Sequence, residues 1–515
     1  MSNSDSESLA ASIFPRAFER SDAASVIFFR IIFGLLMATW AWDYLSTGRV
    51  TELYVKPEFH FGYYGFDWVQ AWPGSGMYFH FLAMSGLALC VALGFQYRIA
   101  AFLLAVLFTY QFLIERTNYQ NHYYLIGLFC WWMPFLPLNR DASMDALIRP
   151  SMRDSTVPSW VLWVLLFHVS VPYFYGGIAK LTTDWLLGQP MGIMLSGQAD
   201  FPVLGSTISG PSMGVVFSYL GLLFDLAIVP LLLWKPTRSL AFLAAVAFHL
   251  SNSVLFSIHV FPWFMIAAST LYFDPSWPRR LLSGAGLEKP KSSTEMFDSA
   301  KSETAPGSIS LRRKVAAGFF AVYVGFHLLW PLRHNFYEGE ASWNERGHFF
   351  AWRMMLRGKE VGLGYALRDP ASGRVTNVNH RQFIAQEQSI KFPRDPEMIL
   401  HMAHHIADKF EETTGRRPEV YALAMTSLNG RKPQLMIDPN VDLAAEPRGI
   451  YYTRDWVPPL EEPLRKEPWD LPVEQWMPYL DLPEIKFMKW MEQQSQVAKE
   501  NASSEQARSD SKPGS

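Results

Sequence analysis

Long apolar runs separated by short polar loops fill the first 330 positions, and they limit what this chain can fold into. Inside a bilayer a chain must satisfy its own backbone hydrogen bonds, so a run of roughly 20 apolar residues forms a spanning helix. Nine runs meet or approach this length: 26–45, 75–96, 98–115, 120–138, 157–179, 212–234, 239–257, 260–273 and 314–332. We therefore predict an α-helical polytopic membrane bundle of about nine spans.

After the last run the pattern changes to that of a soluble α+β region. Residues 364–368 and 375–378 flank an Asp-Pro-Ala-Ser-Gly turn and favour a hairpin, and 396–413 carry a helical period. Residues 418–438 favour two further strands around Asn429-Gly430. The predicted units are an N-terminal segment (1–25), a catalytic bundle (26–275), a linker (276–313), a last span (314–332), an α+β domain (333–498) and a disordered tail (499–515).

Lysine and arginine in the loops predict the orientation of the bundle. If the spans alternate, the basic residues gather on one side: Arg16, Arg20, Arg98, Arg140, Arg149, Arg153, Lys235, Arg238, Arg279, Arg280, Lys289, Lys291, Arg312, Arg313 and Lys314. Basic loops stay in the cytoplasm, so we expect a cytoplasmic N-terminus and an external region from 333 onward. The first 25 residues are polar, so the first apolar run is expected to serve as both signal and anchor.

Composition and missing motifs exclude several classes of function. The net charge of −2 comes with no basic face, which argues against a nucleic-acid partner. Both cysteines, Cys90 and Cys130, lie in apolar runs, so no disulfide is expected in the soluble region. Catalytic-triad, P-loop and dinucleotide signatures are absent.

Two titratable residues lie at the predicted outer ends of spans. Lys180 closes an apolar run, and is either a snorkelling lysine or a partly desolvated amine able to act as a base. His122, beside Asn121 at the start of the fourth run, is either a polar tip at the interface or a functional group. Because both belong to outward-facing helix ends, they are expected at the same depth, which favours a shared site.

Other polar residues lie inside the apolar runs. Arg30 and Asp225 must face protein or a wet cavity, as a structural ion pair or in a functional role. His249 and Asn252 share one helical face, where interhelical hydrogen bonding and contact with a polar ligand head group both remain open.

A histidine-rich stretch lies on the predicted soluble helix. His401, His404, His405 and Asp408 share one face of it. The spacing could hold a metal, but an exposed polar face is commoner, and no metal is predicted.

Several segments, taken in order, resemble the vitamin K-dependent γ-glutamyl carboxylase family over residues 25–465. The segments are 29–37, Asn121-His122 with 124–128, 179–188 from Ala179-Lys180 to Asp184-Trp185, 248–258 with His249 and Asn252, 277–279, Trp343, Trp352, and 438–442. Each is weak alone, but their order and spacing are specific.

The resemblance implies an enzyme that uses molecular oxygen to convert vitamin K hydroquinone, or a related quinol, to its epoxide. That oxidation supplies the base that removes a γ-proton from a glutamyl residue, which then takes up carbon dioxide. It implies that Lys180 deprotonates the quinol and that His122 assists carboxylation. It also implies substrate contacts at Asn121, Asp184, Trp185, Trp343 and Trp352, and quinol contacts at His249 and Asn252. The expected partners are the lipid bilayer and a glutamyl peptide or protein.

The sequence also departs from the family. Animal members are longer and use a disulfide that this chain cannot form, and Gly347 replaces a leucine of their glutamate-binding segment. A bacterial plasma membrane is therefore expected. Two alternatives stay open: a quinol epoxidase or oxidase that carboxylates nothing, and a non-catalytic transporter or lipid-binding protein.

Overall fold

The computed structural model is mostly a bundle of helices. It describes residues 16–202, 205–210, 212–256, 258–284, 311–449 and 454–510. Seven segments are long and apolar enough to span a membrane. They are α2 (Ala24–Ser46), α3 (Gly76–Leu93), α4 (Tyr97–Ile114), α7 (Ser159–Ala179), α11 (Met213–Leu233), α12 (Arg238–Phe256) and α16 (Leu311–Leu329) with the following 3-10 turn η7 (Trp330–Phe336). The predicted helical membrane bundle is confirmed.

The two other predicted spans are shorter helices, α5 (Asn121–Trp132) and α13 (Phe261–Ser269). Each continues into a 3-10 turn, η3 (Met133–Phe135) or η5 (Thr270–Tyr272). At 1.5 Å per residue, the 12 residues of α5 rise only about 18 Å, less than the hydrocarbon thickness. Both helices pack among the longer ones and bury Phe129 and Phe264 in the core, although Trp131 and Trp263 are 39% and 51% exposed.

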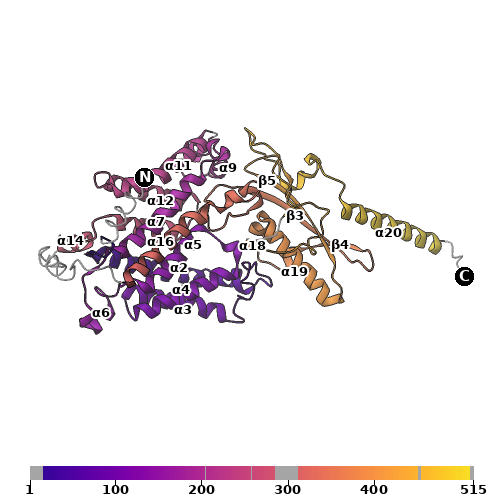
Figure 1. The fold of residues 1–515 in the computed structure, drawn as a ribbon. Coiled ribbons are helices and arrows are strands. Elements are labelled where there is room, and N and C mark those ends of the chain that lie inside the picture. The colour runs from indigo at the N-terminus through magenta and orange to yellow at the C-terminus, as the bar shows by residue number, and fades with distance from the viewer. Residues whose placement is uncertain are drawn as a thin grey trace.

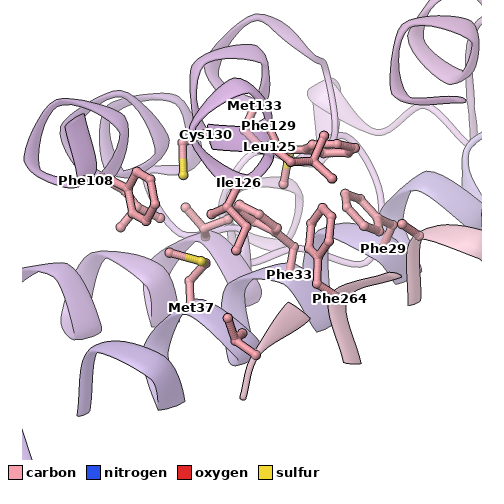
Figure 2. Close-up of a cluster of buried hydrophobic side chains, with 14 of the residues drawn as sticks. Phe29, Phe33, Met37, Phe108, Leu125, Ile126, Phe129, Cys130, Met133 and Phe264 are labelled. Atoms are coloured by element: carbon pink, nitrogen blue, oxygen red, sulfur yellow. The ribbon is translucent and has the colours of Figure 1, made fainter. Parts of the chain in front are cut away.

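Aromatic side chains from α2, α5 and α13 fill the centre of the bundle (Figure 2). The Phe29 ring lies 5.4 Å from that of Phe129 and 6.0 Å from that of Phe264, and the last two are 5.0 Å apart. All three are buried. These tilted and edge-on contacts are favourable ring arrangements, so the short helices hold the bundle together from inside.

One end of the bundle is closed by its basic loops. Strand β1 (Arg20–Asp22) pairs with β2 (Thr156–Pro158). Arg279 of α14 (Trp277–Gly284) forms ion pairs with Asp22 at 3.0 Å and with Asp141 at 2.5 Å. Buried Arg30 donates to the carbonyls of Leu138, Ala92 and Ala142. Hydrogen bonds to backbone carbonyls therefore accommodate the charge of Arg30, and not an ion pair with another span. Of the predicted linker, 285–310 lie outside the described residues.

The C-terminal region lies at the opposite end, where it joins the bundle on the right of Figure 1. Its antiparallel sheet has the order β4-β3-β5-β6, with β3 (Lys359–Arg368), β4 (Val375–Val378), β5 (Glu419–Leu428) and β6 (Gln434–Leu435). Both predicted hairpins are present. Helix α19 (Pro396–Thr414) covers one face, and the start of α20 (Lys486–Asp510) packs on the other. Short elements complete it: α17 (Ala341–Asn344), α18 (Gln386–Lys391), η8 (His380–Gln382), η9 (Phe392–Arg394), η10 (Val473–Gln475) and η11 (Met477–Tyr479).

Helix α20 extends to Asp510, into the segment expected to be disordered; residues 511–515 lie outside the described part.

The orientation of the bundle in the membrane can be tested by labelling one residue at each of its two ends. Pro370 lies in the exposed β3–β4 turn, and Lys235 is exposed in a basic loop at the other end. We expect Pro370→Cys to react with an impermeant thiol reagent on intact cells, and Lys235→Cys to react only after permeabilisation. Wild-type protein, whose Cys90 and Cys130 lie in spans, sets the background. The opposite labelling pattern would show that the C-terminal region is cytoplasmic.

Candidate functional site

A buried ion pair lies where α7 ends near the C-terminal region. Lys180, which caps α7, extends its Nζ to Asp225 Oδ2 of α11 at 2.6 Å and to the Gly176 carbonyl at 3.2 Å. Lys180 is 6% exposed and Asp225 5%. Sequence analysis singled out both residues separately but did not pair them. The structure shows an amine held inside the protein, so Lys180 is not a snorkelling side chain.

Glycines allow α7 and α11 to approach closely enough for this pair. A Cβ on Gly176 would lie 3.1 Å from Asp225 Oδ2, and one on Gly177 would lie 2.6 Å from the Leu226 side chain. The Trp185 ring forms another wall, with Lys180 Nζ 5.1 Å from its centroid. Trp185 donates its indole N–H to the Ser218 carbonyl at 2.7 Å, which fixes that wall.

His249 lies deeper in the bundle and faces α7. Its Nε2 is 2.6 Å from the hydroxyl of Tyr173, two turns before Lys180 on the same face of α7. Its Nδ1 is buried with no hydrogen-bond partner among the described residues. An unsatisfied ring nitrogen inside an apolar bundle is costly, so it marks a place where a polar group of a ligand would be stabilised. Asn252, one turn further along α12, is half-buried.

His122 reaches the same region through one aromatic ring. It stacks on Phe261 at 5.2 Å, and Phe261 meets the His249 ring edge-on at 5.8 Å. His122 and His249 are thus linked through Phe261, and His249 contacts Tyr173, which lies two turns from Lys180 on α7. Tyr173 and Phe261 were not foreseen, because aromatic residues are too common in these runs to stand out.

A segment of the C-terminal region closes this end of the bundle. We call residues 349–356 the docking segment. Its Trp352 belongs to the bundle core and lies 5.0 Å from the Tyr124 ring, while Met355 and Leu356 pack in the cluster around Trp185. Asn121 donates to the Arg353 carbonyl at 3.4 Å. The predicted substrate residues Asn121 and Trp352 thus meet at the boundary between the two halves.

Tyr119 fastens the docking segment. Its hydroxyl accepts from the Phe350 N–H at 2.6 Å and donates to Asn121 Oδ1 at 3.0 Å. Burial raises the pKa of Tyr119 well above its usual value, so the phenol keeps the proton that this second bond needs.

Asp184 links the bundle to the β5–β6 turn. Its two oxygens accept from Arg431 at 2.6 and 2.8 Å, and Asn429 adds a bond at 2.8 Å. Asn429 and Gly430 both have positive φ, 53° and 76°, and the Arg431 N–H donates to the Leu428 carbonyl at 3.1 Å, so a tight turn begins the loop between β5 and β6. Asp184 therefore has a structural role that the sequence did not reveal, and its substrate contact stays a prediction.

The remaining predicted residues lie away from Lys180. Trp343 is buried in the core of the C-terminal region, with its indole N–H donating to the Pro458 carbonyl at 2.8 Å. His404 bonds to the Glu446 carbonyl and Asp408 pairs with Arg417, so these side chains have separate partners. Among the described residues, no group of three His, Cys, Asp or Glu side chains could hold a metal.

A cavity of about 370 Å³ opens beside the C-terminal end of α7. Its walls come from α7, η7, residues 337–341 and the docking segment, and its polar members include Thr182, His334, Asn335, Tyr337, Glu340 and Arg353.

The connection between the halves is testable through Arg431. Its pair with Asp184 is mostly buried, with side chains 10% and 18% exposed, whereas the pair of Arg417 with Asp408 is 40% and 58% exposed. We expect Arg431→Met to cost about 3–5 kcal/mol of unfolding free energy. The control Arg417→Met should cost under about 1 kcal/mol. Thermal unfolding in detergent measures both, and equal midpoints would show that the Asp184 contact does not stabilise the protein.

Comparison with known families matches both halves of the chain. Residues 18–277 match the HTTM domain, and residues 312–463 match the vitamin K-dependent gamma-carboxylase, lumenal domain. The first match alone covers half of the chain and contains Lys180, Asp225, His122 and His249. No solved structure matches the chain.

Proposed function

The chain belongs to the vitamin K-dependent gamma-carboxylase family, and from that premise we propose that it is a membrane carboxylase. It couples oxygen-dependent epoxidation of vitamin K hydroquinone, or of a related quinol, to γ-carboxylation of glutamyl residues. The observation that carries the proposal is the buried pair of Lys180 and Asp225 at the end of the bundle that adjoins the C-terminal region. A quinol reaches this place through lipid and a peptide reaches it through water.

The pair can exchange a proton without exposing charge to the bundle. Asp225 Oδ2 lies 2.6 Å from Lys180 Nζ, so it is the group placed to take the proton that Nζ must release before it can act as a base. When the proton resides on Asp225, the Nζ lone pair of Lys180 can accept a proton from a quinol hydroxyl. Asp225 is thus a positioning residue that sets the state of Lys180.

The surroundings suit an aromatic ring with polar ends. Phe224, Phe248 and Phe261 surround His249, whose unpaired Nδ1 offers one polar contact. An apolar site with a few convergent polar groups is typical for a small aromatic ligand. The bound quinol, once oxidised, supplies the strong base, and the docking segment helps exclude the water that would quench it.

The glutamyl residue approaches from the C-terminal region. The cavity beside α7 is lined by Ala179 and Leu181, which flank Lys180 in the sequence. Its Arg353, 3.7 Å from Glu340, supplies a cation for a carboxylate. His122, on the first turn of α5, assists the carboxylation step from the other side of Phe261. The substrate contacts of Asp184, Trp185, Trp343 and Trp352 and the quinol contact of Asn252 stay predictions. The C-terminal region is proposed to lie outside a bacterial plasma membrane.

Removing the amine tests the first half of the reaction. We expect Lys180→Ala to abolish epoxide formation, and Lys180→Arg to fail as well, because a guanidinium does not release its proton. Leu187→Ala, at an exposed position outside the cavity, is the matched control and should retain activity. Epoxide is measured with purified protein, reduced vitamin K and oxygen. Near wild-type epoxidation by Lys180→Ala would show that another group is the base.

Replacing His122 tests the coupling between the two halves. His122→Phe keeps an aromatic ring against Phe261 but removes both nitrogens. We expect carboxylation to fall about 10²–10⁴-fold, the usual effect of losing one proton-transfer group, with epoxidation much less affected. Incorporation of labelled carbon dioxide into a glutamyl peptide is measured beside epoxide. Equal losses would assign His122 to the quinol pocket. Wild-type epoxidation without any incorporation would favour the quinol oxidase alternative, and no quinol turnover would favour a non-catalytic protein.

A further inference from the structure

A second cavity, of about 630 Å³, opens at the end of the bundle opposite the C-terminal region. It lies between the start of α4, the short helix α6 (Met144–Ile148) and the turn η4 (Pro150–Met152). Four arginines line it: Arg98, Arg140, Arg149 and Arg153. The proposed reaction uses none of them.

The carboxylates of this cavity are already occupied. Asp145 accepts from the backbone N–H groups of Gln96 and Tyr97 at 2.8 and 3.1 Å, and from Asn139 Nδ2 at 2.8 Å. These bonds attach α6 to the turn between α3 and α4. Asp145 is therefore committed to the fold rather than to the arginines.

Asp154 is committed in the same way. It pairs with Arg20, accepts from the Thr156 N–H at 3.0 Å, and lies 3.4 Å from Arg140. Arg98, Arg149 and Arg153 are exposed, and within the described part of the chain none of them forms an ion pair. The cavity therefore presents three uncompensated guanidinium groups.

Apolar side chains border the same cavity. Ile99 and Ile148 line it and are 60% and 61% exposed, and Leu147, the residue before Ile148 on α6, is 65% exposed, although isoleucine and leucine are usually buried. Ile99 belongs to the first turn of a spanning helix, and α6 lies beside that turn, so these side chains lie at the membrane boundary. Guanidinium groups next to exposed apolar residues at this depth match a lipid, with a charged head and an apolar body.

We propose that this cavity binds the phosphate head group of an anionic phospholipid. Arg98, Arg149 and Arg153 hold the phosphate, for which guanidinium geometry is well suited, and the acyl chains lie along Ile99, Leu147 and Ile148. The proposal goes beyond the carboxylase function and does not depend on it.

Lipid retention by the full chain tests this site. Protein purified in detergent is mixed with phosphatidylglycerol or with phosphatidylcholine, and the bound lipid is counted by native mass spectrometry. We expect phosphatidylglycerol to be retained preferentially. Arg98→Gln combined with Arg149→Gln and Arg153→Gln should weaken its binding by about a hundredfold, from the usual contribution of each basic residue at a membrane surface.

A matched variant removes the same charge elsewhere. Arg16→Gln, Lys235→Gln and Arg280→Gln take three positive charges from the same end of the bundle but lie outside the cavity. This variant should retain phosphatidylglycerol. Ile148→Glu, a single change at an exposed position, should weaken retention and guards against misfolding of the triple variant.

Three results would overturn the proposal. Wild-type protein could retain both lipids equally, which removes the head-group preference. The matched variant could lose phosphatidylglycerol as much as the cavity variant does, which assigns the effect to overall charge. Inorganic phosphate at millimolar concentration could displace the lipid, which assigns the site to free phosphate.

Discussion

The cost of placing charge in an apolar bundle determines how this protein is built. Two charged side chains buried in the bundle, Arg30 and Lys180, have partners that offset their desolvation. Arg30 donates to two loop carbonyls and to the Ala92 carbonyl at the end of α3, and Lys180 meets Asp225 near the other end of the bundle. The two arrangements differ in what they allow. Backbone carbonyls cannot take a proton from Arg30, so its charge is fixed. The Asp225 carboxylate can exchange a proton with Lys180.

Close helix packing is what makes the second arrangement possible. Gly176 and Gly177 let the backbone of α7 approach α11 within the reach of an amine, and larger residues would meet Asp225 and Leu226. The first match with a known family spans all the bundle residues involved, and the second spans the docking segment that covers them. Both halves of the chain therefore build the end of the bundle that holds Lys180 and Asp225.

The sequence predicted those parts of the fold that depend on local pattern. Run length identified the spans, and Asn429-Gly430 identified the β5–β6 hairpin, because both signals lie within a few residues. It also singled out Lys180 and Asp225 as costly charges. It could not join them, because 45 positions separate them and only the packing of α7 on α11 brings them together. Trp352 was predicted only from the family resemblance. The residue pattern of the C-terminal region does not show that this tryptophan packs in the core of the bundle.

Gly347 and the docking segment have a consequence for how the protein is made. Gly347 has a φ of 71°, and a Cβ there would lie 2.7 Å from the His334 backbone, so the leucine of the animal enzymes would not fit. Phe350, Trp352 and Met355 also have positive φ, each at a cost of about 1–2 kcal/mol for a residue with a side chain. Contacts with the bundle offset that cost. During biosynthesis the bundle helices are translated before the docking segment. The docking segment therefore folds against a bundle that is already inserted in the membrane, and the bundle acts as its template.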